Sequence, residues 1–354
     1  MAQPRVIQYE MLECRRLAVG MQDGVELWWK LNLLRTLSND GIARLALNTP
    51  TLARQALAPL AWNGALHRSS QGHAVEMSEH NYFSHQSEVD GRWPNQMVRD
   101  QGYPLPLSLS SQRNDVETLL AGTQLQSVDA VMAEILQNDN ARNQLFPSAK
   151  SASLATEIGI GGAHNGDSTF DYYWSTQVAG RHQGERFLTG IVYSDQNGNQ
   201  NFDAGEGVAG IRVTSGELST LSDTNGVYAL AVGGGRHHVR FENAAQQTLA
   251  ESTLFVGERS IVVDLRVNDA MTEINYRKRS WWTNADNHVD VNRDQHVNPI
   301  DALVIINQLN RTGPQILSSN NPNPAFASNA VDTNGDSNVS ATDALVVINY
   351  LNRA

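Results

Sequence analysis

The sequence predicts a multidomain α+β protein built from three successive regions, which differ in how their apolar residues are spaced. Apolar residues recur at helical spacing between about residues 25 and 145, and they alternate with polar residues in short runs between 187 and 266. From residue 284 onward, an acidic loop and the apolar stretch after it occur twice. A length of 354 residues suits two or three such domains.

Composition and charge narrow the class of protein. The net charge of −11 disfavours a nucleic-acid partner and fits a secreted calcium binder. Cys14 is the only cysteine, so no disulfide can form within the chain. No run approaches 18 apolar residues, which predicts no transmembrane helix.

The first 24 residues read as a leader without a core or a clear signal-peptide apolar region. Residues 12–18 are similar to a short motif, roughly L-E-x-R-x-L, near the N-termini of many exported planctomycete proteins. The alternative is an ordinary basic N-terminal tail. We expect an extracellular or cell-surface protein.

The region from 25 to 181 predicts helices followed by a late hairpin. Helical spacing covers 25–48, 64–81, 95–100 and 127–145, and strands are expected at 156–162 and 172–178. This order of elements predicts an α/β sandwich. Six segments resemble, in order, those of the CAP superfamily, the SCP-like domain of secreted proteins: P-L-A-W-N-G-A-L, G-H-A-V-E-M, Y-F-S-H, V-E-T-L-L-A-G, T-E-I-G-I-G and Y-Y-W-S-T-Q-V-A-G.

The resemblance implies an α/β/α sandwich with a cleft that often carries two histidines and two glutamates, sometimes around a divalent metal. His85 matches the first histidine and Glu117 the first glutamate, whereas Ala141 stands at the position of the second histidine. Glu134 is near the second glutamate but off register. Two protein ligands make a poor metal site, so we expect His85 and Glu117 to form a hydrogen-bonded structural pair.

A second set of polar residues shares one face of the helix predicted at 64–81. These are His73, Glu76 and His80. Their spacing is compatible with metal binding, but we expect a packed, hydrogen-bonded His73 with two solvated neighbours.

The region from 187 to 266 predicts a small β-sandwich, with strands at 188–193, 211–213, 226–230, 238–241 and 261–265. Its first loop places oxygen-bearing side chains at positions 1, 3, 5, 7, 9 and 12 of a calcium loop. They are Asp195, Asn197, Asn199, Asn201, Asp203 and Glu206. The alternative is a metal-free Asx-turn. The region resembles the prealbumin-like B repeat of bacterial surface adhesins, with Gln200 where those repeats often have Gly.

The repeated tail predicts two further calcium loops, each followed by one amphipathic helix. The first set of ligands is Asp290, Asn292, Asp294, His296 (through its carbonyl), Asn298 and Asp301. The second set is Asp332, Asn334, Asp336, Asn338 (through its carbonyl), Ser340 and Asp343. We expect the apolar stripes Leu303, Ile306, Leu309 and Leu345, Ile348, Leu351 to define the helices.

Residues 284–354 resemble a type I dockerin, a small all-α module with two EF-hand-like calcium loops that docks onto cohesin domains. The resemblance implies that loop positions 10 and 11 help select the cohesin. Here they are Pro299, Ile300, Ala341 and Thr342. Gln295 and Ser337 occupy position 6, where Gly is usual, which costs about 1 kcal/mol and weakens calcium binding.

These observations predict an exported binding and assembly protein with a calcium cofactor, a cohesin partner and a linker at 267–283. The resemblance to dockerins implies a context of polysaccharide breakdown. One alternative is a hydrolase that cleaves a peptide or lipid ester through His85 and Glu117. Another is a cell-surface adhesin. A small-molecule, lipid or peptide ligand of the CAP cleft is compatible with each.

Overall fold

The structure is a computed structural model that describes residues 21–36, 57–147, 155–181, 185–199, 201–256, 259–267, 272–277, 282, 284, 287, 289–294, 296–317, 329–333 and 338–352. The chain divides into two compact units. The first comprises residues 1–32 and 58–276, and the second comprises 33–57 and 277–354. The export-like motif at 12–18 and the loop residues Gln200, Gln295, Asn334, Asp336 and Ser337 lie outside the described residues.

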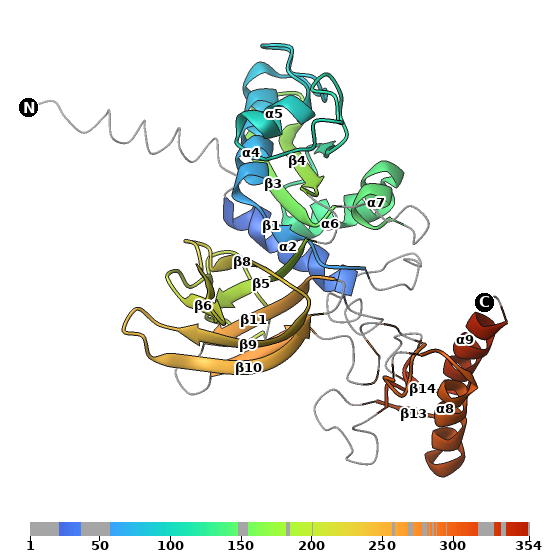
Figure 1. Ribbon diagram of the computed structural model, residues 1–354. Coiled ribbons are helices and arrows are strands. Elements are labelled where there is room, and N and C mark those ends of the chain that lie inside the picture. Colours follow the sequence, from blue (N-terminus) through green and yellow to red (C-terminus); the bar gives the residue numbers. More distant parts are fainter. Residues whose placement is uncertain are drawn as a thin grey trace, which may run out of the picture. The chain divides into compact units, whose positions relative to one another are not determined.

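The N-terminal region is mixed α/β, as predicted (Figure 1). Its elements are α2 (Met21–Thr36), β1 (Ala61–Trp62), α4 (Gly64–His80), α5 (Pro94–Asp100), β2 (Glu117–Ala121), α6 (Val128–Gln137), α7 (Asp139–Leu145), β3 (Glu157–Asn165) and β4 (Asp171–Ala179). The strands form one sheet in the order β1-β3-β4-β2, in which β1 runs parallel to β3 and the other pairs are antiparallel.

The prediction of a single helix at 127–145 is wrong. Asn138 ends α6 and also begins α7, because its side chain accepts hydrogen bonds from the backbone N–H groups of Asn140 and Ala141. The short strands β1 and β2 were not predicted. The helices α4 and α5 and the β3–β4 hairpin are confirmed within a few residues.

Helix α4 lies directly on β3, and glycines make this contact possible. A Cβ atom at Gly159 would lie 2.0 Å from the His67 backbone nitrogen, and one at Gly161 would lie 2.2 Å from that of Gln71. The close approach lets the Ser70 hydroxyl donate to the Gly159 carbonyl at 3.0 Å. The G-I-G spacing in the sequence therefore fixes how closely the helix that carries His73 approaches the sheet.

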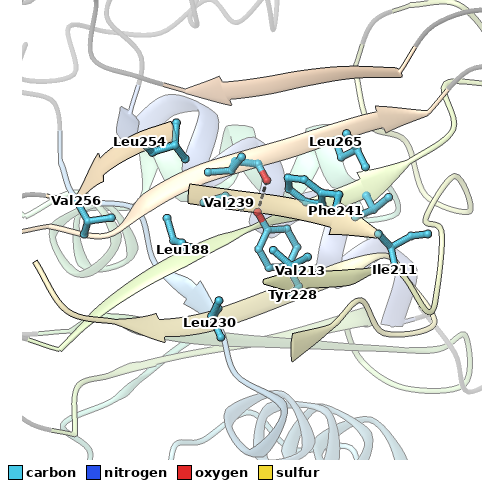
Figure 2. Packing of buried hydrophobic residues seen from close by; sticks show 12 residues of the cluster. Leu188, Ile211, Val213, Tyr228, Leu230, Val239, Phe241, Leu254, Val256 and Leu265 are labelled. Atoms are coloured by element: carbon cyan, nitrogen blue, oxygen red, sulfur yellow. Dashed lines mark hydrogen bonds between the residues drawn. The ribbon is translucent and has the colours of Figure 1, made fainter. Parts of the chain in front are cut away.

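The middle region consists of two four-stranded sheets, in the orders β10-β9-β6-β7 and β12-β11-β5-β8. The strands are β5 (Arg186–Tyr193), β6 (Arg212–Ser215), β7 (Leu218–Leu221), β8 (Val227–Val232), β9 (Gly235–Glu242), β10 (Thr248–Val256), β11 (Ile261–Val267) and β12 (Thr272–Arg277). Figure 2 shows Phe241 and Val239 of one sheet beside Tyr228 and Leu265 of the other in a shared apolar core. Strands β7 and β10 were missed, and β12 shows that the linker predicted at 267–283 begins too early.

The first helix contacts this middle region, which the sequence did not predict. The Trp29 indole N–H donates to a carboxylate oxygen of Asp264 on β11 at 3.1 Å. The Trp29 ring lies 6.4 Å from that of Phe202, whose side chain is buried. The Ala204 backbone N–H donates to Glu26 at 3.1 Å. Helix α2 is therefore shared by the N-terminal and middle regions.

The C-terminal region is built around α8 (Pro299–Thr312) and α9 (Ala341–Leu351), with the two-residue strands β13 (Gln315–Ile316) and β14 (Asn338–Val339) paired antiparallel. Ala302, Ile305, Ala344 and Val347 are the helix residues buried in its apolar core. The apolar stripe predicted for each helix is therefore only partly the buried one. Leu309 and Leu351 pack against the core, whereas Leu303, Ile306, Leu345 and Ile348 are exposed.

Candidate functional site

Glu117 is a buried carboxylate at the centre of a polar cluster in the N-terminal region. It begins β2, and Asn114 fixes that start by accepting the Glu117 backbone N–H at 2.8 Å. The side chain is enclosed by Ser175 and Gln177, which alternate along β4 and so share one face of the sheet. Helix α4 contributes His73, and the loop after α4 contributes His85.

Each carboxylate oxygen of Glu117 accepts hydrogen bonds. Oε1 accepts from His73 Nδ1 at 2.8 Å, from the Ser175 hydroxyl at 2.7 Å and from the Gln177 amide at 3.1 Å. Oε2 accepts from His85 Nδ1 at 3.0 Å. Burial alone would raise the pKa of Glu117, but the bonds from His73, His85 and Ser175 lower it to about 2. The carboxylate is therefore ionised across the physiological range.

An ionised carboxylate can only accept, so both histidines carry a proton on Nδ1. Their Nε2 atoms are then the basic ones. The His73 side chain is fully buried, whereas 42% of the His85 side chain is exposed. A buried carboxylate that orients an exposed imidazole can hold a proton acceptor, or a single metal ligand, toward solvent.

The sequence anticipated the hydrogen bond between His85 and Glu117 and the burial of His73, but not the bond between His73 and Glu117. Glu76 is not a solvated neighbour. It is half-buried and accepts hydrogen bonds from the hydroxyls of Tyr82 and Ser87. Helical spacing places His73 on the buried face of α4 with Ser70 and Met77, but it does not identify Glu117, 44 residues away, as its partner.

The other positions singled out by the sequence resemblance, Ala141 and Glu134, do not add a ligand to this cluster. Ala141 is fully buried in α7, and three residues on, Gln144 donates to the carbonyl of Val116 at 2.7 Å. Helix α7 thus contacts the start of β2, but Ala141 has no donor atom. Glu134 lies in α6 and is not among the groups that bond Glu117. Among the described residues around Glu117, no group of three or more His, Cys, Asp or Glu side chains is arranged to hold a metal ion.

A second buried carboxylate, Glu157 on β3, has different partners. Arg181 donates to both of its oxygens, at 2.7 and 2.8 Å. The Tyr103 hydroxyl and the Asn63 amide donate at 2.9 and 2.7 Å. Burial raises the pKa of Tyr103, and the Glu157 charge raises it further. Glu157 therefore ties the start of α4, through its cap Asn63, to β3.

The acidic loop of the middle region closes on itself through hydrogen bonds. Both oxygens of Glu206 accept backbone N–H groups, from Gln196 at 2.9 Å and Asp203 at 3.0 Å. Asp195 forms an ion pair with Arg266 of β11 at 3.5 Å. Asn197 and Asn199 both donate to Asp203, and Asn201 donates its N–H to Asn199. The predicted calcium site here stays a prediction, and Arg266 already supplies positive charge beside its first ligand.

In the first C-terminal loop, the side chains at positions 3 and 5 bend the backbone by Asx-type hydrogen bonds. Asn292 accepts from the Asp294 N–H at 2.9 Å, and Asp294 accepts from the His296 N–H at 2.8 Å. Asp301, at position 12, is fully buried and accepts from the N–H groups of Val291 and Asn298 at 2.7 and 2.9 Å. One carboxylate therefore holds both ends of the loop.

The second loop repeats this construction. Asp343 is fully buried and accepts from the backbone N–H groups of Thr333 and Ser340, each at 2.9 Å. In both repeats the position-12 aspartate forms a capping box with the helix N-cap, Asn298 or Ser340. The sequence signal for this was N-x-x-D and S-x-x-D before each apolar run. Asp290 and Asp332, at position 1, are also buried.

Residues 288–352 match the family model of the dockerin type I domain. Type I dockerins bind calcium through EF-hand-like loops, and a dockerin implies docking onto a cohesin in a modular extracellular protein. The donor set fits this ion, because each loop places two buried carboxylates where oxygen ligands are needed. Pro299, Ile300, Ala341 and Thr342, predicted to select the cohesin, are all exposed at the N-termini of the two dockerin helices.

Two of the solved structures that match this chain show only weak likenesses. One is an extracellular protein containing an SCP domain from Bacillus anthracis, with 22% identity and a TM-score of 0.26, over 39% of this chain and 37% of that one. The other is an outer surface protein from Borrelia burgdorferi, with 16% identity and a TM-score of 0.29, over 46% of this chain and 96% of that one. No curated protein matches the chain. None of the helices in the described part of the chain is long and apolar enough to cross a membrane.

Proposed function

We propose that this chain is an exported assembly protein whose dockerin docks onto a cohesin in the presence of calcium and so displays the N-terminal and middle regions on a scaffold. Within this proposal, residues 25–181 form a CAP domain and 187–277 form a B-repeat-like spacer. Pro299, Ile300, Ala341 and Thr342 contact the cohesin. A context of polysaccharide breakdown rests on the resemblance to dockerins alone.

The observation that carries the proposal is the duplicated use of a buried position-12 aspartate. Asp301 and Asp343 each close a loop and cap the helix that follows it, with the same hydrogen bonds in both copies. When calcium is bound, its charge offsets the cluster of carboxylates. The loop geometry then sets the start of α8 and α9, whose exposed N-termini carry the predicted selecting residues. Calcium, loop shape and docking surface are thereby linked.

Calorimetry of the full-length chain against purified type I cohesin domains tests the proposal. We expect binding to at least one cohesin in calcium and no detectable heat in the presence of a chelator. Pro299→Ala with Ala341→Ser, which change selecting positions but no loop ligand, should alter which cohesin binds and leave calcium affinity unchanged. Failure of all cohesins in saturating calcium would contradict the proposal.

One observation favours a second candidate, a CAP-domain hydrolase. Glu117 orients His85 so that its Nε2 atom is directed away from the carboxylate on a side chain that is 42% exposed. His85 would act as general base, and a peptide or lipid ester would be the substrate. A hydrolase screen of the full-length chain against esters and peptides, with His85→Ala as the control, separates this candidate from a binding role. His85→Ala should abolish any genuine activity without changing calcium-dependent cohesin binding.

A further inference from the structure

Helix α2 is buried on two faces, and each face contacts a different region of the chain. The Trp28 indole and the Asn32 amide donate to the Leu60 carbonyl, at 2.8 and 2.9 Å, within the N-terminal region. Glu26 and Trp29 contact the middle region instead. Each pair is separated by three or four positions, so its two members share one face of the helix. Helix α2 therefore takes part in two packing interfaces at once.

Asp264 on β11 receives Trp29 at a break in the parallel pairing of β5 with β11. The ladder stops after Thr189 and resumes at Val192. Between them, the Ile191 backbone N–H donates to Oδ1 of Asp264 at 3.0 Å, while Oδ2 accepts the Trp29 indole N–H at 3.1 Å. Asp264 is buried. One buried carboxylate thus serves the sheet with one oxygen and α2 with the other, and removing either donor from it should be costly.

The acidic loop 195–206 contacts the same face of α2. The Ala204 backbone N–H donates to a Glu26 carboxylate oxygen at 3.1 Å. The buried Phe202 ring lies 6.4 Å from that of Trp29 and 5.9 Å from that of Tyr193, the last residue of β5. Trp29, Phe202 and Tyr193 thus form a series of aromatic contacts from α2 to β5. Such pairs stabilise an interface beyond the area that they bury.

The connection between the two regions is short, and their strands lie close together. Strand β4 ends at Ala179 and β5 begins at Arg186. Strand β1 of the N-terminal region contacts both β5 and β8. A cavity lined in part by Gln22, Gly205 and Asn225 has a volume of about 20 Å³, which is room for one water molecule. Because a short connection keeps the effective concentration of the two surfaces high, a small interface is enough to hold them together.

We infer that α2 is a strap that makes the N-terminal and middle regions one cooperative folding unit, with Trp29 as its main contact. The middle region is then not an independent spacer. It is the surface on which the N-terminal region is held. Destabilising one region should therefore destabilise the other, and this transmission should require Trp29. The inference goes beyond the proposed function, because it depends on neither calcium nor a cohesin.

Hydrogen exchange of the full-length chain in mild denaturant tests whether destabilisation passes from one region to the other. Val98 is fully buried in the apolar core of the N-terminal region. Val98→Ala leaves a cavity there and should increase the opening of that region about 10-fold or more. The readout is the exchange of backbone amides in β9 and β11 of the middle region.

The exchange is compared in three forms of the chain, each with and without Val98→Ala. The first is otherwise unmodified, and the second carries Trp29→Ala, which cuts the strap. The third carries Trp28→Phe, the matched control, which removes an indole N–H from the other face of α2. Should Trp29→Ala not fold, Trp29→Phe replaces it, because that variant keeps a ring beside Phe202 and removes the donor to Asp264.

We expect Val98→Ala to speed the exchange of β9 and β11 about 10-fold in the otherwise unmodified chain and in Trp28→Phe. In the Trp29 variant, the same change should alter this exchange by less than about twofold. Unchanged exchange of β9 and β11 in Val98→Ala alone would overturn the inference, because the two regions would then be independent. An equal effect with and without the Trp29 substitution would also overturn it, because the coupling would not pass through α2. Cohesin binding should be the same in all these variants, so either failure leaves the proposed function intact.

Discussion

Glu117 in the N-terminal region and Asp301 in the dockerin are both buried carboxylates, but they are held in different ways. The donors to Glu117 are side chains from α4, the loop after it and β4. The donors to Asp301 are backbone N–H groups of its own loop. The first arrangement depends on the whole domain. The second is local, and the charge of its neighbours Asp290 and Asp294 makes it depend on a cation.

The comparison explains what could be predicted from the sequence. A local site is encoded by spacing, so one short pattern was enough to predict the loop ligands, and the structure shows the position-12 aspartates Asp301 and Asp343 closing their loops. The Glu117 cluster needs the fold, because His73 and Glu117 are 44 residues apart and meet only when α4 lies on the sheet. Family resemblance supplied His85 and Glu117, but the bonds from His73, Ser175 and Gln177 appeared only in the structure.

The errors have the same origin. The apolar stripe predicted for α8 included Leu303 and Ile306, which are exposed, because the helix also carries apolar residues on its buried side and periodicity cannot rank two apolar faces. The split at Asn138 was missed because the apolar pattern continues across it, whereas the capping side chain decides where each helix ends. The strand β2 is only five residues long, and β4 beside it determines its conformation.

The largest expected effect comes from removing both local carboxylates. In Asp301→Ala with Asp343→Ala, each loop loses a ligand and each helix loses its capping box, so the dockerin should not fold at any calcium concentration. The helices of 14 and 11 residues are too short to persist alone. Calorimetry should show that cohesin binding is lost. Retained binding would mean that packing alone holds the helices, and Asn307→Ala with Asn349→Ala serves as the control.

Glu157→Gln should cause the next largest loss. The variant leaves Arg181 without its buried carboxylate partner and weakens the bonds from Tyr103 and Asn63, so we expect about 2–4 kcal/mol of destabilisation at neutral pH. Chemical denaturation of the full-length chain, with the transition of the first unit followed by tryptophan fluorescence, measures it. Glu117→Gln is the matched variant and should lose less, because the amide oxygen can still accept from His73. The reverse order of the two losses would contradict the different roles assigned to these carboxylates.

The stability of the native chain should depend on pH below about 4.5 in a way that the stability of Glu117→Gln does not. The pKa of Glu117 is lowered in the folded state to about 2 from 4.5, so its contribution to stability is complete above about pH 4.5 and disappears as pH falls toward 2. Because a pKa shift of one unit corresponds to about 1.4 kcal/mol, the lowered pKa of Glu117 contributes at most about 3 kcal/mol to the free energy of unfolding. Unfolding free energies of the native chain and Glu117→Gln should therefore converge between pH 4.5 and 2. Parallel curves over that range would show that the carboxylate is not held as described.

The smallest effect is expected at the loop of the middle region. Glu206 accepts two backbone N–H groups, so Glu206→Ala should lower stability by about 1–3 kcal/mol even in the presence of a chelator. If this loop also binds calcium, the loss will be greater in calcium than in chelator. Melting temperatures in both conditions measure the difference. An unchanged melting temperature in chelator would contradict the hydrogen-bonded closure of the loop.

Hydrogen exchange on the full-length chain, in calcium and in chelator, tests most directly the claim that the dockerin carboxylates need a cation and the Glu117 cluster does not. Peptides from α8 and α9 should lose nearly all protection when calcium is removed, and peptides from α4 and β2 should keep theirs. Both regions are measured in one sample, so each is the control for the other. Equal protection of α8 and α9 in the two conditions would contradict the account.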